Sequence, residues 1–152
     1  MAAQKIDGRA LAAQVRDEVA SRVDGLRTQG ITPGLSVILV GDNPASQVYV
    51  RNKERMAGKV GISAETIRLP HDVPPGLLLE EIQRLNADPK VDGILVQLPL
   101  PEQFSGGLDA EILGQIDPNK DVDGLHPMNL GRLLAGEDGF VACTPSGCMR
   151  ML

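Results

Sequence analysis

The sequence predicts an α/β fold, a three-layer αβα sandwich around a mostly parallel sheet. Helix-type and strand-type patterns alternate along roughly the first 100 residues. Two short runs, 35–40 and 91–98, are almost entirely apolar, which is typical of strands buried on both faces. Strands that alternate with helices are joined by right-handed crossovers and pair in parallel. No internal repeat or linker divides the chain.

The first helix is expected to start at Asp7-Gly8, where the aspartate can serve as the N-cap. Apolar residues then recur every three or four positions and form one stripe, until Gly30 ends the helix. The stripe consists of Leu11, Val15, Val19, Val23 and Leu26. The strand 35–40 follows, with a glycine on either side.

Turn and cap residues indicate where the next helices and strands begin. The Asp-Asn-Pro sequence at 42–44 supplies a cap and an N1 proline for a helix that runs to about residue 61. Residues 62–69 predict a weaker and more polar strand. A Pro-Pro pair at 74–75 opens a helix with apolar residues at helical spacing, and the strand 91–98 follows it.

Beyond Pro99 the periodicity weakens. Residues 108–116 predict a short helix, and residues 127–134 predict another. The segment between them, 117–126, is rich in Asp, Asn, Pro and Gly, a composition that favours a loop.

The last residues predict the beginning of another helix. Thr144 and Pro145 form an N-cap and N1 pair, yet only two turns fit before Leu152. Because so short a helix needs packing to be stable, we expect a fragment of a longer protein. The alternative is a small C-terminal turn docked on the domain. On the first interpretation, 1–141 form one domain and 142–152 begin an inter-domain helix.

Composition and charge exclude several classes of function. Lys and Arg total 15 against 20 Asp and Glu, a net charge of -5, and only 2% of residues are aromatic. Both values disfavour nucleic-acid binding. No apolar run approaches the roughly 18 residues of a membrane span, and the N-terminus lacks a signal-peptide pattern. Cys143 and Cys148 fit neither a zinc nor a disulfide pattern, so we expect a cytoplasmic protein that binds no membrane.

Ligands of parallel sheets bind beyond the carboxyl ends of the strands, where we expect segments 41–46 and 97–101 to lie. The helix that starts at this edge carries Tyr49 and Lys53, about 40° apart on one face. Such a pair can stack a planar ligand beside an amine, or it can be an ordinary solvated pair. Gln97 ends an apolar strand and either serves this site or satisfies loose backbone groups at the strand end.

The acidic segment 119–124 resembles the start of a calcium-binding loop. Position 12 of that loop would be Leu130 instead of the required Glu, so calcium is rejected and no metal is expected. The carboxylates of the segment can accept hydrogen bonds from a donor-rich heterocycle, or they can cap the next helix. His71 and His126 are isolated from each other, and we assign them no role.

Five segments together resemble the N-terminal catalytic domain of the bifunctional methylenetetrahydrofolate dehydrogenase/cyclohydrolase family. The combination of YVRNK, VQLPLP and KDVDG in this order and spacing is highly specific. The resemblance extends along nearly the whole chain. The segments are DGRALA, VGDNPASQVYVRNKERMAGKVGI, EEIQRLNADPKVDGILVQLPLP, DPNKDVDGLHPMNLGRL and CTPSG.

The resemblance implies an activity in one-carbon metabolism. Members of the family oxidise 5,10-methylenetetrahydrofolate to the methenyl form with NADP, or with NAD in some members, and hydrolyse the product to 10-formyltetrahydrofolate. The expected partners are tetrahydrofolate derivatives and, for the full-length enzyme, a second copy of itself. Hydrolysis needs a group that activates water near neutral pH, which a lysine beside a ring and a neutral amide can supply.

The resemblance also implies the site residues. Lys53 matches the catalytic lysine, Gln97 the glutamine that positions it, and Asp123 the aspartate that holds the pterin. Tyr49 matches the tyrosine that packs against the folate rings. The expected substrate-binding set is Tyr49, Lys53, Gln97, Leu98, Pro99 and Asp123.

The chain departs from the family in two respects. Ala142 stands where many members have proline. Family members also continue into a Rossmann domain that binds the nicotinamide cofactor, whereas these 152 residues contain no GxGxxG sequence. We therefore expect no cofactor-binding residue in this chain. The alternative function is a folate-binding or interaction fragment without catalytic activity.

Overall fold

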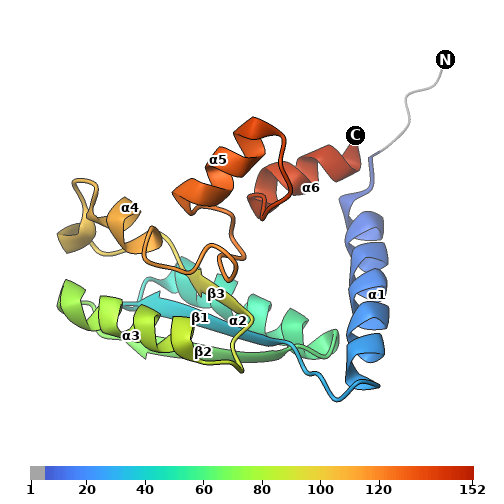
Figure 1. Cartoon of the computed structure of the whole chain (residues 1–152), viewed down its shortest axis with the longest axis horizontal. Coiled ribbons are helices and arrows are strands. Elements are labelled where there is room, and N and C mark those ends of the chain that lie inside the picture. Colours follow the sequence, from blue (N-terminus) through green and yellow to red (C-terminus); the bar gives the residue numbers. More distant parts are fainter. Residues whose placement is uncertain (1–5) are drawn as a thin grey trace.

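The computed structural model describes residues 6–152 and confirms the α/β class (Figure 1). Three parallel strands form one sheet in the order β2-β1-β3. Their bounds are Gly34–Val40 (β1), Ser63–Leu69 (β2) and Gly93–Val96 (β3). The last five residues of the central strand β1 and all four residues of β3 are buried, as expected for apolar strands covered on both faces.

Residues 6–152 contain six α-helices and one 3₁₀ turn, and only the turn lacks a counterpart in the sequence prediction. Local capping explains the first two helix starts, because the side chains of Asp7 and Asn43 accept hydrogen bonds from backbone N–H groups of the first turn. The bounds are Gly8–Arg27 (α1), Pro44–Lys59 (α2), Pro75–Ala87 (α3), Glu102–Phe104 (η1), Leu108–Leu113 (α4), Pro127–Ala135 (α5) and Cys143–Met151 (α6).

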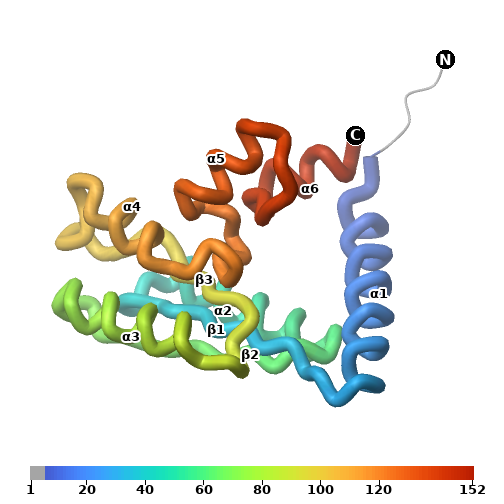
Figure 2. Tube along the Cα trace, in the orientation of Figure 1, coloured from blue at the N-terminus to red at the C-terminus, as the bar shows by residue number. Residues whose placement is uncertain are grey.

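Helices cover both faces of the sheet and produce the predicted three layers (Figures 1 and 2). On one face, Ile38 and Val96 belong to a buried cluster with Ile82 of α3. On the other face, Val37 packs in a second cluster with Val50 of α2. Successive strand residues point to opposite faces, so β1 needs apolar residues at consecutive positions. Each fully buried Ile or Leu contributes about 1.5–3 kcal/mol.

Helix α1 stands at one end of the sheet instead of lying flat against a face (Figure 1). Val23 is the one buried residue of its apolar stripe, and Val15 and Val19 are half-buried. An ion pair of 3.0 Å between Arg150 of α6 and Glu18 of α1 joins the two helices. Among the described residues, no helix combines the length and apolar character needed to cross a membrane.

The strand predicted at 91–98 is shorter, since β3 spans only Gly93–Val96. Just before its start the Asp92 carboxylate accepts a hydrogen bond from the N–H of Gly34 at 2.8 Å, while the N–H of Asp92 donates to the carbonyl of Gly34 at 2.9 Å. At its end the N–H of Gln97 still reaches the carbonyl of Ile38 at 2.8 Å. Pro99, which follows a cis peptide bond, has no N–H with which to continue the pairing.

The predicted cap of the last helix is also wrong, because α6 begins at Cys143 and Ala142 is its N-cap. The carbonyl of Ala142 accepts the first helical hydrogen bond, from the N–H of Ser146 at 3.1 Å. Thr144 and Pro145 therefore lie inside the first turn. A proline is tolerated there because N–H groups of the first turn have no helical acceptor.

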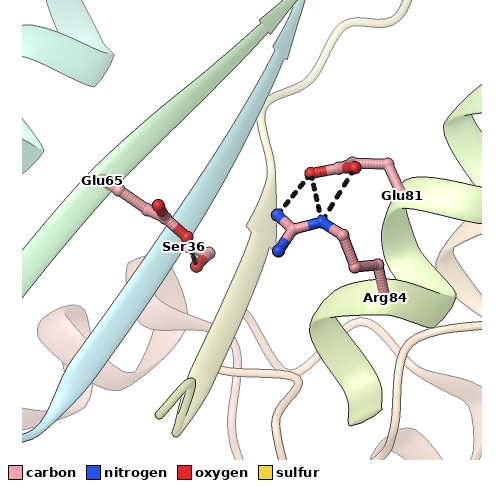
Figure 3. Close-up of polar contacts among 4 residues, drawn as sticks. All are labelled: Ser36, Glu65, Glu81 and Arg84. Atoms are coloured by element: carbon pink, nitrogen blue, oxygen red, sulfur yellow. Dashed lines mark hydrogen bonds and ion pairs between the residues drawn. The ribbon is translucent and has the colours of Figure 1, made fainter. Parts of the chain in front are cut away.

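Polar side chains at the amino-terminal end of the sheet are paired with one another (Figure 3). The buried Ser36 hydroxyl donates to Glu65 of β2 at 2.6 Å. On α3, Arg84 donates to Glu81 at 2.6 Å, and this carboxylate raises the pKa of the guanidinium further. These contacts give this end of the sheet a structural role.

Candidate functional site

The carboxyl ends of β1 and β3 bring two distant segments of the chain together. Three residues separate the end of β1 from the start of α2 at Pro44, and α2 runs back along one face of the sheet. Gln97 directly follows β3 and remains tied to the central strand by its backbone bond to Ile38. The predicted edge therefore contains both candidate segments.

Lys53 and Gln97 are in direct contact at this edge. The ammonium Nζ of Lys53 donates to Oε1 of Gln97 at 3.0 Å. The Nε2 of Gln97 donates to the backbone carbonyl of Leu98 at 2.7 Å. Gln97 thus satisfies a backbone group at the strand end and also contacts the lysine. The lysine is half-buried.

Tyr49 lies one turn before Lys53 on α2 and is 61% exposed. Its ring is therefore accessible from solvent, as a stacking platform for a planar ligand must be. Leu98 and Pro99 lie beside this region and border a pocket of about 500 Å³ with Phe104 of the 3₁₀ turn.

Asp123 belongs to the loop between α4 and α5. Its carboxylate and the ammonium of Lys53 both affect the thiol of Cys143 at the start of α6. Burial is the main cause that raises the pKa of the Cys143 thiol, and the Asp123 carboxylate raises it further. The positive charge of Lys53 lowers the same pKa. Charges of opposite sign on Lys53 and Asp123 therefore both act on one sulfur atom. Cys143 is not among the site residues that the sequence predicts, although it belongs to the CTPSG segment.

The loop that carries Asp123 is fixed by its neighbour Asp121, which is 2% exposed. The Oδ2 of Asp121 accepts hydrogen bonds from the N–H of His126 at 2.8 Å and from Nδ2 of Asn129 at 2.9 Å. The Asp121 carboxylate thus binds the N–H of the N-cap residue of α5, in agreement with the alternative that the loop carboxylates cap the next helix. The cap of α5 is His126, whose Nδ1 accepts from the N–H of Met128 at 3.0 Å. His126, which we had given no role, is structural.

Gly124 allows the Asp123 loop to pack against the segment that leads into α6. Its φ is +67°, a left-handed conformation that favours glycine. A Cβ at this position would lie 2.7 Å from the backbone N of Ala142 and from the backbone C of Val141. The backbone on both sides of Asp123 is therefore closely confined.

A groove of about 490 Å³ opens between α1, α2 and β3, and Lys53 and Cys143 both border it. Half-buried apolar residues of α1, among them Val15 and Val19, line the opposite wall. Within residues 6–152, no cluster of three or more His, Cys, Asp or Glu side chains is arranged to hold a metal ion.

A comparison with models of known protein families shows to which family the chain belongs. Residues 6–123 match the model described as tetrahydrofolate dehydrogenase/cyclohydrolase, catalytic domain. The chain belongs to this family. The resemblance found in the sequence is therefore confirmed.

Relatives of this tetrahydrofolate dehydrogenase/cyclohydrolase domain agree with that result. The bifunctional protein FolD of Heliobacterium modesticaldum is 53% identical over 152 residues, which are 100% of this chain and 52% of that protein. The crystal structure of FolD from Campylobacter jejuni is 44% identical with a TM-score of 0.92, covering 97% of this chain and 51% of that one.

A third relative is the methylenetetrahydrofolate dehydrogenase-cyclohydrolase of Trypanosoma brucei, solved in complex with NADP and an inhibitor. It is 38% identical with a TM-score of 0.90, covering 99% of this chain and 51% of that one. This member of the family thus spans about half the length of the relatives it matches.

Proposed function

We propose that this chain is the folate-binding catalytic half of a bifunctional enzyme of one-carbon metabolism. The enzyme oxidises 5,10-methylenetetrahydrofolate to 5,10-methenyltetrahydrofolate with NADP and hydrolyses the product to 10-formyltetrahydrofolate. The observation that carries the proposal is the 3.0 Å contact between Lys53 and Gln97 in a chain of this family.

Hydrolysis is the step that the residues of this chain explain best. The methenyl carbon bridges two nitrogens as an electrophilic amidinium, and water must add to it. In the proposed mechanism Nζ of Lys53, which Gln97 holds in place, exchanges protons with the attacking water. The bond between the carbon and N5 then breaks as one proton of the water passes to N5. The second proton is released to solvent as the C=O forms, and the formyl group stays on N10. General acid–base groups of this kind contribute about 10²–10⁴-fold.

The other residues orient the reactants. Gln97 fixes the position of Nζ through a neutral amide, so it adds no charge beside the cationic substrate. The exposed ring of Tyr49 stacks on the folate rings. Asp123 accepts hydrogen bonds from N–H groups of the pterin, and Leu98 and Pro99 border the part of the ligand that lies beyond it.

The residues of this chain do not fit an NADP site. Dinucleotide pyrophosphates bind at a glycine-rich turn that precedes a helix N-terminus, and the 152 residues contain no GxGxxG sequence. We assign cofactor binding to a further domain of a longer protein. A structure of a relative in complex with NADP supports the choice of cofactor.

In the proposed organisation 1–141 form the folate-binding domain and 142–152 begin the helix that leads to the cofactor domain. Residues 1–5 of the first segment lie outside the described part of the chain. The homodimeric state and the cytoplasmic location stay predictions. A folate-binding fragment without catalytic activity is the alternative.

Assays of the full-length protein test the proposed function. We expect NADP-dependent oxidation of methylenetetrahydrofolate and hydrolysis of methenyltetrahydrofolate in the same preparation. Folate binding without either activity would support the inert alternative. Sequencing the gene beyond the codon for Leu152 provides an independent test, since a glycine-rich strand-turn-helix pattern should follow in frame.

A further inference from the structure

The side chain of Lys120 joins the acidic loop to the end of helix α3. Its Nζ donates hydrogen bonds to three backbone carbonyls, those of Leu85 at 3.1 Å, Asn86 at 2.8 Å and Asp88 at 2.8 Å. An ammonium group has three protons, so these acceptors use its full donor capacity.

The chemistry of a helix end explains why a lysine occupies this place. The last carbonyls of α3, which ends at Ala87, carry the negative end of its dipole. The N–H of Asp88 already donates to the carbonyl of Leu85 at 3.2 Å, and Lys120 adds a cationic donor to this group and to the carbonyls of Asn86 and Asp88. A cation near the C-terminus of a helix is favourable for both reasons. Helix α3 is itself fixed in the core by the fully buried Leu78, Ile82 and Leu85.

The backbone of Lys120 is tied to the sheet at the same time. Its carbonyl accepts a hydrogen bond from the N–H of Ile94 at 2.7 Å, and the next residue, Asp121, forms a parallel bridge with Ile94. Ile94 belongs to β3, the strand that Gln97 follows. Lys120 therefore connects the loop to two rigid elements, α3 through its side chain and β3 through its backbone.

Asp123 lies three residues beyond Lys120 in this loop. Between these two residues the loop is also held by Asp121, whose carboxylate accepts a hydrogen bond from Asn129 of α5. We propose that Lys120 is a positioning residue, which sets the place of Asp123 relative to the Lys53–Gln97 pair. This inference rests on the proposed function, because it assumes that Asp123 binds the folate.

The test is a double-mutant cycle in the full-length enzyme with Lys120→Met, Asp123→Ala and the double variant. Kd for a folate analogue, KM and kcat for methenyl hydrolysis, and the thermal midpoint are measured for each. We expect Lys120→Met to raise Kd and KM about tenfold, as when one charge-assisted hydrogen bond is lost, with kcat within about threefold. In the Asp123→Ala background the same change should add less than about twofold, because the residue it acts through is gone.

Two further variants separate positioning from general stabilisation. Lys120→Arg should restore Kd to within about threefold of the wild type, because a guanidinium also donates to several carbonyls. Lys90→Met removes an exposed lysine from the same end of α3 and should leave Kd unchanged. If Lys120→Met does not fold, the cycle is run with Lys120→Gln, whose neutral amide offers only two donors, and its loss of affinity should again vanish without Asp123.

The outcomes distinguish this inference from the proposed function. Losses that multiply in the double variant, or a fall in kcat with KM unchanged, would overturn the positioning role of Lys120 and leave the enzyme assignment intact. A wild-type enzyme that binds no folate would overturn both. Non-additive Kd values in a protein without hydrolase activity would support Lys120 and contradict only the catalytic proposal.

Discussion

Nζ of Lys53 and Oε1 of Gln97 lie 3.0 Å apart although 44 positions separate the residues in the sequence. The lysine comes from α2 and the glutamine from the end of β3, so the contact depends on the parallel pairing of β1 with β3. The amide is fixed in turn by its own bond to the carbonyl of Leu98. The amine is therefore held at one place on the carboxyl edge of the sheet.

Replacing Lys53 by Gln or Ala in the full-length enzyme should reduce methenyl hydrolysis by about a hundredfold or more, as expected when a general acid/base is removed. The rate is followed by the loss of methenyl absorbance at saturating substrate. Lys59→Gln, in the exposed last turn of the same helix, is the matched control and should retain the wild-type rate. A Lys53 variant within threefold of the wild type would rule out the assigned role.

The two neighbouring aspartates should behave differently when each is changed to Ala. Asp123→Ala should weaken binding of a folate analogue about ten- to hundredfold, the effect of losing a hydrogen bond to a charged group, and should change the free energy of unfolding by less than about 0.5 kcal/mol. Asp121→Ala should cost about 1–3 kcal/mol of unfolding free energy, because the buried Asn129 loses an acceptor.

Titration calorimetry and denaturant unfolding of both variants measure these effects. Equal losses of affinity, or a larger loss for the Asp121 variant at a temperature where both proteins are folded, would show that the assignment of Asp123 is incorrect.

Alkylation of Cys143 should report the charges around it. Only the thiolate reacts, and burial with the Asp123 carboxylate raises the pKa of the thiol, so the reaction at pH 8 should be slower than for an ordinary thiol. The same shift favours the folded state at pH values below the ordinary thiol pKa, and this contribution is lost as pH rises through the raised value.

The rate of iodoacetamide reaction against pH is measured in the 152-residue chain with Cys148→Ser, which leaves one thiol. Lys53→Gln should move the midpoint to higher pH, because a positive charge is lost, and Asp123→Asn should move it to lower pH. Midpoints that do not move in these directions would show that the three groups are not neighbours.

The 152-residue chain should fold but should not oxidise methylenetetrahydrofolate. The two buried clusters on the faces of the sheet provide a core, whereas the sequence offers no turn for the dinucleotide pyrophosphate. Circular dichroism checks folding, and the NADP-dependent change in absorbance checks turnover. A turnover of about 1 per second or faster would place a cofactor site within these residues.

The parts of the fold that the sequence predicts correctly are those set by neighbouring residues, such as helix caps and apolar runs. Asp7 and Asn43 cap the helices that they were expected to start, and the apolar run at 35–40 is the central strand. The predictions failed at the ends of two elements. β3 is shorter than its apolar run, and the Asp92 carboxylate before it accepts a hydrogen bond from the N–H of Gly34. α6 starts at Cys143 although Thr144 and Pro145 suggested a later start.

The sequence by itself determined the fold class, the family and the candidate residues Lys53, Gln97 and Asp123, because caps, periodicity and motifs are properties of neighbouring residues. Only the tertiary structure decided which distant groups meet. It brings the Lys53 amine to the Gln97 amide, the charges of Lys53 and Asp123 to the Cys143 sulfur, and Lys120 to the end of α3. Such contacts span tens of residues and depend on how the sheet and its helices pack, which no local pattern encodes.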